Sequence, residues 1–305
     1  MNKNLIAGID IGGTKTHVLV SRDGQIVADD VTPTANWRTW DSATDAEGLA
    51  ALVKRVASDE DVAASAFGAH GCDTDEQCRQ LQTDLSARMT GLVRVVNDSE
   101  LLVPAAGYFS GIGVVSGTGS IAVARGRKGE MLAAGGWGWI LGDEGSAPAL
   151  VREAARAVRG SIDAGNLNDP LIDALMTVLG TKEATKLGRL LNENRSAVVW
   201  GRYAGAVFSA AGAGSPLAAK VIEDGGRALG ALVEVLIGRG ADASRVVAGG
   251  GVIVEQPRLM DAFRASMADV SPTSEVILLR DPPVKGALAL AAHLLDQTAH
   301  GALRA

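Results

Sequence analysis

Near its N-terminus the chain reads Ile9-Asp10-Ile11-Gly12-Gly13-Thr14-Lys15-Thr16. An apolar run with one acidic residue breaks here at two glycines and then meets hydroxyl side chains, which is typical of a strand that turns tightly beneath a phosphate. Glycines let backbone N–H groups approach phosphate oxygens, and the carboxylate of Asp10 can hold a magnesium ion. Two glycines between strands are, by themselves, more typical of a simple hairpin. The motif therefore needs support from the rest of the chain.

A later segment repeats the order of elements around this motif. Both copies are predicted to contain three short strands, over residues 5–11, 17–21 and 26–29 in the first and 113–115, 121–124 and 131–133 in the second. The turn of the second copy is Ser116-Gly117-Thr118-Gly119-Ser120. Each copy thus offers one Gly-Thr turn. Two such turns are needed if two lobes bind one polyphosphate from opposite sides.

Predicted strands and helices alternate between the two copies and again toward the C-terminus. Strands are predicted over 63–69, 92–96, 246–248 and 275–279, and helices over 46–57, 75–89, 147–159, 170–178, 182–191, 198–211, 217–238 and 284–293. This alternation and the duplication predict an α/β fold with two lobes around a cleft. We expect an N-terminal lobe at 1–109, a C-terminal lobe with a helical insertion at 110–284, and a last helix at 285–305 that returns to the first lobe.

Composition narrows the class of protein. The chain has 305 residues, 47% of them hydrophobic, and a net charge of −6, so it lacks the basic surface that nucleic acid requires. Its two cysteines, Cys72 and Cys78, are too few for a zinc site and fit a reducing compartment. No signal peptide is recognisable, and the most apolar stretches contain Glu234 and His293 and are too short to span a bilayer. We therefore expect a cytoplasmic protein without nucleic-acid or membrane partners.

Four features occur in one order: the Asp10 turn, Asp98 at a strand end, the Ser116 turn and the glycine run at 249–251. Together they resemble the sugar-kinase branch of the actin-like, ribonuclease-H-like ATPase superfamily, and most closely the N-acetylglucosamine kinase family, which is grouped with the BadF/BadG-type ATPases. The resemblance extends from Gly8 to the Gly286-Ala287-Leu288 segment. Its strongest part is residues 135–147, Gly-Gly-Trp-Gly-Trp-Ile-Leu-Gly-Asp-Glu-Gly-Ser-Ala, which follow the family's Gly-Asp-Glu-Gly-Ser signature.

Asp98 is the candidate catalytic base. A sugar hydroxyl is a poor nucleophile, so a carboxylate must orient it and accept its proton during phosphoryl transfer. The resemblance places the base at this position. The structural alternative is a helix N-cap, a role that Ser99 can fill instead.

The resemblance also implies the sugar contacts. Asp143 would bind sugar hydroxyls, Asn36 would contact the sugar, and Trp137 would lie against a pyranose face. Alternative roles are a helix-capping acid for Glu144, a hydrolase carboxylate pair, a turn residue for Asn36 and plain packing for the tryptophans. The full set of expected sugar-binding residues is Asn36, Trp37, Asp98, Gly136, Trp137, Gly138 and Asp143.

On the nucleotide side, the two Gly-Thr turns would hold the phosphates of ATP, and the glycine run would let adenosine lie against bare backbone. The alternative for the glycine run is a helix C-cap or tight turn. Lys15 is either a phosphate contact or a solvated side chain. The expected ATP-binding residues are Gly12, Gly13, Thr14, Lys15, Gly117, Thr118, Gly119, Ala211, Gly249, Gly250 and Gly251, and the expected Mg²⁺ ligand is Asp10.

These expectations describe an ATP-dependent kinase for the 6-hydroxyl of an amino sugar, with N-acetylglucosamine as the first candidate. Free glucosamine is the nearest alternative, because its ammonium group would need a carboxylate such as Glu144 or Asp73. Two rival hypotheses are an ATPase activator of a radical dehydratase, with a cysteine-bound iron-sulfur cluster, and a non-catalytic sugar sensor. Relatives are often homodimers. His70 departs from the small residues that the family has at its position, and it is either a selectivity residue or a hydrogen-bonded loop histidine.

Overall fold

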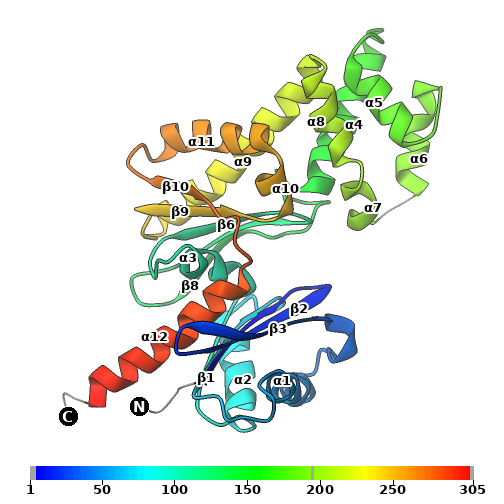
Figure 1. The fold of residues 1–305 in the computed structure, drawn as a ribbon. Helices are drawn as coiled ribbons and strands as arrows, with labels where there is room; N and C mark the ends of the chain where they lie inside the picture. The colour runs from blue at the N-terminus through cyan, green and yellow to red at the C-terminus, as the bar shows by residue number, and fades with distance from the viewer. Residues whose placement is uncertain (1–4, 194–195, 303–305) are drawn as a thin grey trace. The chain divides into compact units, whose positions relative to one another are not determined.

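The computed structural model describes residues 5–193 and 196–302. The chain divides into two compact units (Figure 1). Unit 1 contains the described residues of Met1–Gly113, Lys128–Met131 and Leu279–Ala305, and unit 2 contains those of Val114–Arg127 and Leu132–Leu278. Each unit is described by itself.

Unit 1 is built on a five-stranded sheet with the order β3-β2-β1-β4-β5. The hairpin strands β1, β2 and β3 are antiparallel, whereas β4 is parallel to both β1 and β5. The strands are β1 (Leu5–Ile11), β2 (Lys15–Arg22), β3 (Gln25–Pro33), β4 (Ala64–Ala69) and β5 (Leu92–Val96). Since β1, β4 and β5 are parallel neighbours, their carboxyl ends lie at one edge of the sheet.

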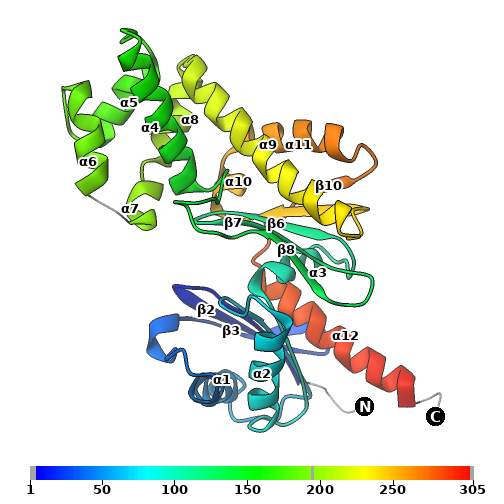
Figure 2. The same ribbon diagram turned by 180° about the vertical axis from the view of Figure 1, so that it is seen from behind.

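Helices cover both faces of this sheet (Figures 1 and 2). On one face, α1 (Ser42–Val56) and α2 (Asp75–Ser86) enclose the main core, which includes Ile9, Ile11 and Phe67. On the other, α12 (Val284–Ala302) packs on small side chains of β4. A Cβ atom on Gly8 would lie 2.4 Å from the backbone nitrogen of Leu288, so the glycine permits the close approach of α12. The remaining short elements are η1 (Thr34–Asn36), η2 (Asp98–Leu101) and α3 (Leu102–Ala105).

The second five-stranded sheet has the order β10-β9-β6-β7-β8. Its strands are β6 (Ile112–Ser116), β7 (Ser120–Arg125), β8 (Met131–Gly135), β9 (Arg245–Gly249) and β10 (Glu275–Leu278). When the strands are numbered within each half, both sheets read 3-2-1-4-5 from the end where the third strand lies. The predicted mixed α/β fold with an internal duplication is thereby confirmed.

Helices dominate the rest of unit 2. Two of them, α9 and α11, lie side by side over the second sheet (Figures 1 and 2), and a Cβ atom on Gly226 of α9 would lie 2.5 Å from the Cβ atom of Ala262 on α11. The helices are α4 (Ala147–Asp163), α5 (Pro170–Val178), η3 (Ala184–Lys186), α6 (Leu187–Glu193), α7 (Ala197–Gly201), α8 (Ala204–Gly212), α9 (Pro216–Gly238), α10 (Gly251–Glu255) and α11 (Pro257–Val270).

Two helix predictions need correction. The sequence patterns above predict no helix over residues 251–270, yet α10 and α11 lie there. Leu259, Met260, Phe263 and Met267 are buried on one face of α11, at the spacing of an amphipathic helix, and Pro257 begins it. The helix expected over 198–211 is two helices, because the chain breaks between Gly201 and Ala204.

No single helix in the described ranges is both long enough and apolar enough to cross a membrane. The segments Ala197–Gly212 and Pro216–Gly238 meet that criterion only as a pair, which is bent by 119°.

Candidate functional site

The first Gly-Thr turn joins β1 to β2. It forms a hairpin and also exposes hydrogen-bond donors at its tip. The Gly12 N–H donates to the Lys15 carbonyl oxygen at 3.0 Å, which closes the hairpin. Gly13, Thr14 and Lys15 at its tip are exposed. Thr34 braces the turn, because its hydroxyl donates to the Gly12 carbonyl at 2.8 Å and its N–H donates to the Thr14 carbonyl at 3.0 Å. The motif can therefore be a hairpin and a phosphate-binding turn at the same time.

Asp10, near the end of β1, is a carboxylate whose surroundings favour a cation. Burial raises its pKa to about 7, and the negative charge of Asp98 contributes to this rise while the ammonium group of Lys15 opposes it. A bound cation relieves the cost of ionising a buried carboxyl group that lies near another carboxylate. The described residues contain no group of three or more His, Cys, Asp or Glu side chains that could hold a metal by themselves.

Asp98 begins the short helix η2 but does not cap it. Asn97 is the N-cap: its side-chain oxygen accepts the Ser99 N–H at 2.9 Å, and its own N–H donates to the Glu100 carboxylate at 3.0 Å. The capping roles considered for Asp98 and Ser99 are therefore wrong. The Asp98 side chain is 27% exposed; its Oδ1 atom accepts the Ser99 N–H at 3.0 Å, and its Oδ2 atom lies 3.6 Å from Nδ1 of His70.

His70, which follows β4, is the functional candidate that the expected site omits. Its Nδ1 atom lies 3.6 Å from Oδ2 of Asp98, and a Cβ atom on Gly13 would lie 3.5 Å from its ring. The adjacent Asp98 carboxylate raises the pKa of His70 above its usual value, despite partial burial. The signal in the sequence was its place at the end of a strand beside β1 and β5.

The two expected sugar contacts that follow β3, Asn36 and Trp37, have different surroundings. Asn36 is exposed at the end of η1, and its amide donates to the Thr32 hydroxyl at 3.4 Å. Trp37 instead packs against the core of unit 1, and its indole N–H donates to the buried Thr16 hydroxyl at 3.1 Å. The structure thus gives Trp37 a packing role, and its contact with a sugar stays a prediction.

In unit 2 the second Gly-Thr turn and the glycine run lie together. A Cβ atom on Gly117 would lie 3.7 Å from the Gly251 nitrogen, and one on Gly250 would lie 2.5 Å from the Ser116 carbonyl oxygen. Gly250 has φ of 103° and is the N-cap of α10, so the glycine run begins a helix and the C-cap alternative is wrong. Thr118 is exposed at the tip of its turn. Ala211, in contrast, is 6% exposed within α8, so its methyl group packs between helices and is not open to a nucleotide.

Residues 136–145, called the 136–145 loop below, carry the remaining sugar candidates. Gly136, Gly138, Asp143 and Gly145 all have positive φ angles, which makes the loop shape unusual. Trp137 is 77% exposed and free to meet a ligand. Trp139 has a structural role, because its ring packs against that of Trp200 at an angle of 45°, with the ring centroids 4.8 Å apart.

Asp143 and Glu144 point to different partners. The Asp143 carboxylate accepts the Gly138 N–H at 3.1 Å, whereas Glu144 pairs with Arg152 at 3.4 Å. Burial raises the pKa of Asp143, partly opposed by the N–H groups of Gly138 and Ser120. Ser146 caps α4 through the Ala149 N–H, so Glu144 is not the cap. The divergence of the two acids also removes the basis for a hydrolase pair.

Hydrogen bonds connect the signature to the second Gly-Thr turn. The Ser116 hydroxyl donates to the Gly145 carbonyl at 2.8 Å, the Ala147 N–H to the Gly117 carbonyl at 2.9 Å, and the Ser120 hydroxyl to the Glu144 carbonyl at 2.8 Å. The Gly-Asp-Glu-Gly-Ser signature and the phosphate turn of unit 2 therefore form one connected structure.

The cysteines do not support the iron-sulfur alternative. Cys72 and Cys78 are both buried in the core of unit 1, and the Cys78 thiol faces the Cys72 carbonyl oxygen at 3.6 Å. Ligands of a cluster shared between two chains must reach the surface, which these thiols do not.

Comparisons with known proteins identify the relatives of this chain. The model of the BadF/BadG/BcrA/BcrD ATPase family matches residues 7–291. An N-acetylmuramic acid/N-acetylglucosamine kinase of Clostridium acetobutylicum is 29% identical over 301 residues, covering 94% of this chain and 97% of the relative. An N-acetyl-D-glucosamine kinase of Dictyostelium discoideum is 26% identical over 316 residues, covering 95% and 98%.

Two solved structures share the fold. A Chromobacterium violaceum protein provisionally named an N-acetylglucosamine kinase has a TM-score of 0.68 at 23% identity, with 95% of this chain and 99% of that chain covered. A ROK family glucokinase of Streptomyces griseus, solved with glucose and AMPPNP, has a TM-score of 0.59 at 20% identity and the same coverage. At these identities the structures establish the fold alone.

Proposed function

The chain belongs to the BadF/BadG/BcrA/BcrD ATPase family, and from this premise we propose that it is an ATP-dependent kinase for the 6-hydroxyl of an amino sugar. N-acetylglucosamine is the preferred acceptor in this proposal, because both curated relatives carry it in their names. The product is N-acetylglucosamine 6-phosphate, and ADP is released.

One observation carries the proposal: Asn97 caps η2, so the partly exposed Asp98 carboxylate is not used as the cap and lies at the edge of the sheet where Asp10 and the first Gly-Thr turn also lie. A base for a sugar hydroxyl and donors for phosphate are needed together in a kinase. Asp98 orients the 6-hydroxyl and accepts its proton as the oxygen attacks phosphorus.

Asp10 fits a magnesium ion. Its carboxyl group is largely buried, its ionisation is made costly by Asp98, and carboxylate oxygen is the ligand that Mg²⁺ prefers. Magnesium, when bound, supplies positive charge to the phosphate oxygens during transfer. Gly13, Thr14 and Lys15 in unit 1 and Thr118 and Gly119 in unit 2 would donate to phosphate, while the N–H groups of Gly12 and Gly117 close the two turns. Gly249, Gly250 and Gly251 offer a surface without side chains for adenosine.

For the sugar we assign Asn36 and Asp98 in unit 1 and Gly136, Trp137, Gly138 and Asp143 in unit 2. The ionised Asp143 would accept hydrogen bonds from sugar hydroxyls, and Trp137 offers its exposed indole face to the apolar side of a pyranose.

A coupled ADP-release assay tests the proposal. The panel contains N-acetylglucosamine, glucosamine, N-acetylmannosamine, N-acetylmuramic acid and glucose, and kcat/KM is compared across it. We expect the highest value for N-acetylglucosamine, with phosphorus NMR placing the phosphate on the 6-oxygen. A higher kcat/KM for glucosamine or N-acetylmuramic acid would identify that sugar as the acceptor instead. ADP release that no sugar accelerates would contradict the kinase assignment.

A further inference from the structure

Arg152 is a charged side chain on the buried face of α4. Its side chain is 10% exposed, and its neighbours Val151 and Ala154 belong to the core of unit 2. A buried guanidinium group is strongly unfavourable unless its donors are satisfied, so its partners define its role.

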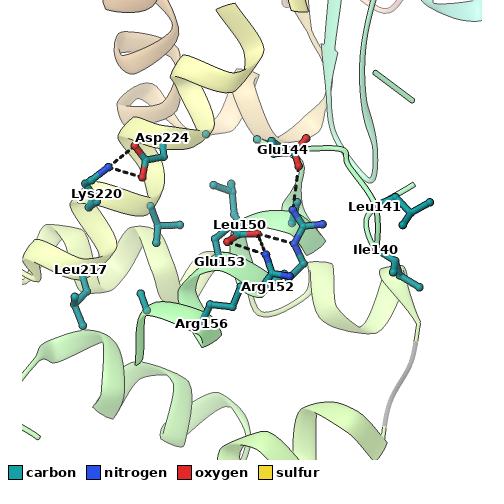
Figure 3. A pocket seen from close by; sticks show the side chains of 15 residues that line it. Ile140, Leu141, Glu144, Leu150, Arg152, Glu153, Arg156, Leu217, Lys220 and Asp224 are labelled. Carbon is teal, nitrogen blue, oxygen red and sulfur yellow. Dashed lines mark hydrogen bonds and ion pairs between the residues drawn. The ribbon is translucent and has the colours of Figure 1, made fainter. Parts of the chain in front are cut away.

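Most of those partners lie in the 136–145 loop. Figure 3 shows one of them, Glu144, beside Arg152. Nη1 of Arg152 donates to the carbonyl oxygens of Trp139 and Gly142, the latter at 3.0 Å. Nη2 lies 3.4 Å from the Glu144 carboxylate, and Nε lies 2.7 Å from the carboxylate of Glu153, its neighbour on α4. The rigid, planar donor set of arginine can hold several acceptors in a fixed arrangement.

We propose that Arg152 is a positioning residue that holds the 136–145 loop in its sugar-binding shape. This inference rests on the proposed function, and Arg152 acts through the loop without touching the sugar. The loop needs such a support because three of its four large apolar side chains contribute little buried surface: Trp137, Ile140 and Leu141 are 77%, 69% and 80% exposed, and only Trp139 is packed.

The carbonyl groups that Arg152 holds lie close in the chain to both proposed sugar contacts. Trp139 follows Trp137 by two residues, and Gly142 directly precedes Asp143. The charge of Arg152 also lowers the pKa of Asp143, against the effect of burial. Removing Arg152 should therefore misplace Trp137 and Asp143 together.

Removing Arg152 should weaken nucleotide binding less than it weakens sugar binding. The three hydrogen bonds that tie the signature to the second Gly-Thr turn use the carbonyl groups of Glu144 and Gly145 and the N–H of Ala147, and none of them involves the Arg152 side chain. A loss confined to the sugar would thus distinguish positioning of the loop from general damage to unit 2.

A pocket of about 700 Å³ adjoins the guanidinium group and offers a second test. Arg152, Glu144 and Glu153 line it together with residues of α9 (Figure 3). In Arg152→Ala the space of the lost side chain is continuous with this pocket, so guanidinium ions from solution can enter and restore the donors.

The experiment compares Arg152→Met, Arg152→Lys and Arg152→Ala with the control Arg156→Met. Arg156 lies on the same helix, is 62% exposed and pairs with Glu153. For each full-length variant we measure the KM of N-acetylglucosamine, the KM of ATP, kcat and the deuterium uptake of the 136–145 loop. We expect Arg152→Met to raise the sugar KM roughly tenfold or more, with the ATP KM changed by less than about twofold and faster exchange confined to the loop.

Arg152→Lys should recover part of the loss, and millimolar guanidinium should improve Arg152→Ala but not Arg156→Met. An unchanged sugar KM overturns the proposal. Faster exchange throughout unit 2 with equal losses for both substrates also overturns it, because that result indicates a merely structural role. If the wild-type protein phosphorylates no sugar, the proposed function fails, whereas the exchange of the loop in Arg152→Met and Arg156→Met still decides the role of Arg152.

Discussion

The Nδ1 atom of His70 lies 3.6 Å from the Oδ2 atom of Asp98. This proximity follows from the sheet, because β1, β4 and β5 are parallel neighbours and Asp10, His70 and Asp98 lie at or just beyond their carboxyl ends. Three polar residues far apart in the chain thus gather at one edge of unit 1, beside the first Gly-Thr turn.

The pair predicts a pH-dependent contribution of His70 to stability. The folded-state pKa of His70 lies above its usual 6.5, so its stabilising effect is complete below pH 6.5 and is lost as the pH rises through the folded-state value. The charges that face it are those of Asp98, Asp73 and Arg38. His70→Gln should lower the free energy of unfolding at pH 5.5, by less than about 1 kcal/mol because the ring is half-exposed, and leave it unchanged at pH 9. Urea titrations at both pH values measure this, and an equal cost at pH 9 contradicts it.

Substitutions at the neighbouring residues Asn97 and Asp98 should have different effects: one should lower stability and the other should lower activity. Asp98→Asn keeps the capping box and should change the free energy of unfolding by less than about 0.5 kcal/mol while lowering kcat by roughly a thousandfold. Asn97→Ala removes the cap and a buried donor to the Cys72 carbonyl, and should cost about 2 kcal/mol. Chemical denaturation and initial rates on the two variants check this. A fully active Asp98→Asn enzyme would remove Asp98 from the role of base.

Neutralising Asp10 should stabilise the metal-free protein. Its folded-state pKa of about 7 exceeds its usual value of 3.8, so the ionised form is disfavoured by folding, and stability falls as the pH rises between these values. A pKa change of that size corresponds to about 4 kcal/mol at most. Asp10→Asn should therefore unfold at a higher temperature than the wild type at pH 8 and at the same temperature near pH 4, in a magnesium-free calorimetric scan. Equal unfolding temperatures at pH 8 would contradict the raised pKa.

The same variant tests the magnesium assignment. Adding Mg²⁺ to the ADP complex should raise the unfolding temperature of the wild type further than ADP does alone. In Asp10→Asn this increment should vanish together with kinase activity. Should the increment survive, Asp10 is not the ligand.

Sequence patterns predicted the sheets better than they predicted the roles of single side chains. The strands over 5–11 and 92–96 and the helix over 170–178 agree with the structure residue for residue, because hydrophobic periodicity and turn residues mark them clearly. The helix α11 was missed although Leu259 and Phe263 lie at helical spacing.

Roles that depend on distant partners were not predictable in this way. Nothing near Trp37 in the chain indicates that its indole N–H binds the Thr16 hydroxyl on β2. In the sequence, nothing distinguishes Arg152 from an exposed residue of a helix, because its contacts with the 136–145 loop are formed only in the folded chain. The capping role of Asn97 was readable in principle, since Glu100 lies three residues later.

Two glycine substitutions should separate a binding role from a folding role. Gly13 lacks a positive φ angle, and a methyl group there would make only an ordinary contact, at 3.5 Å, with the His70 ring. Gly13→Ala should therefore keep the unfolding temperature but raise the KM of ATP roughly tenfold, because the methyl group keeps phosphate oxygens from the backbone donors. Gly250→Ala, at φ of 103° and 2.5 Å from a backbone oxygen of Ser116, should instead cost about 3 kcal/mol or more of stability. Calorimetry and ATP titrations on both variants decide the matter: a Gly13→Ala enzyme with an unchanged KM for ATP would show that the first Gly-Thr turn is only a hairpin.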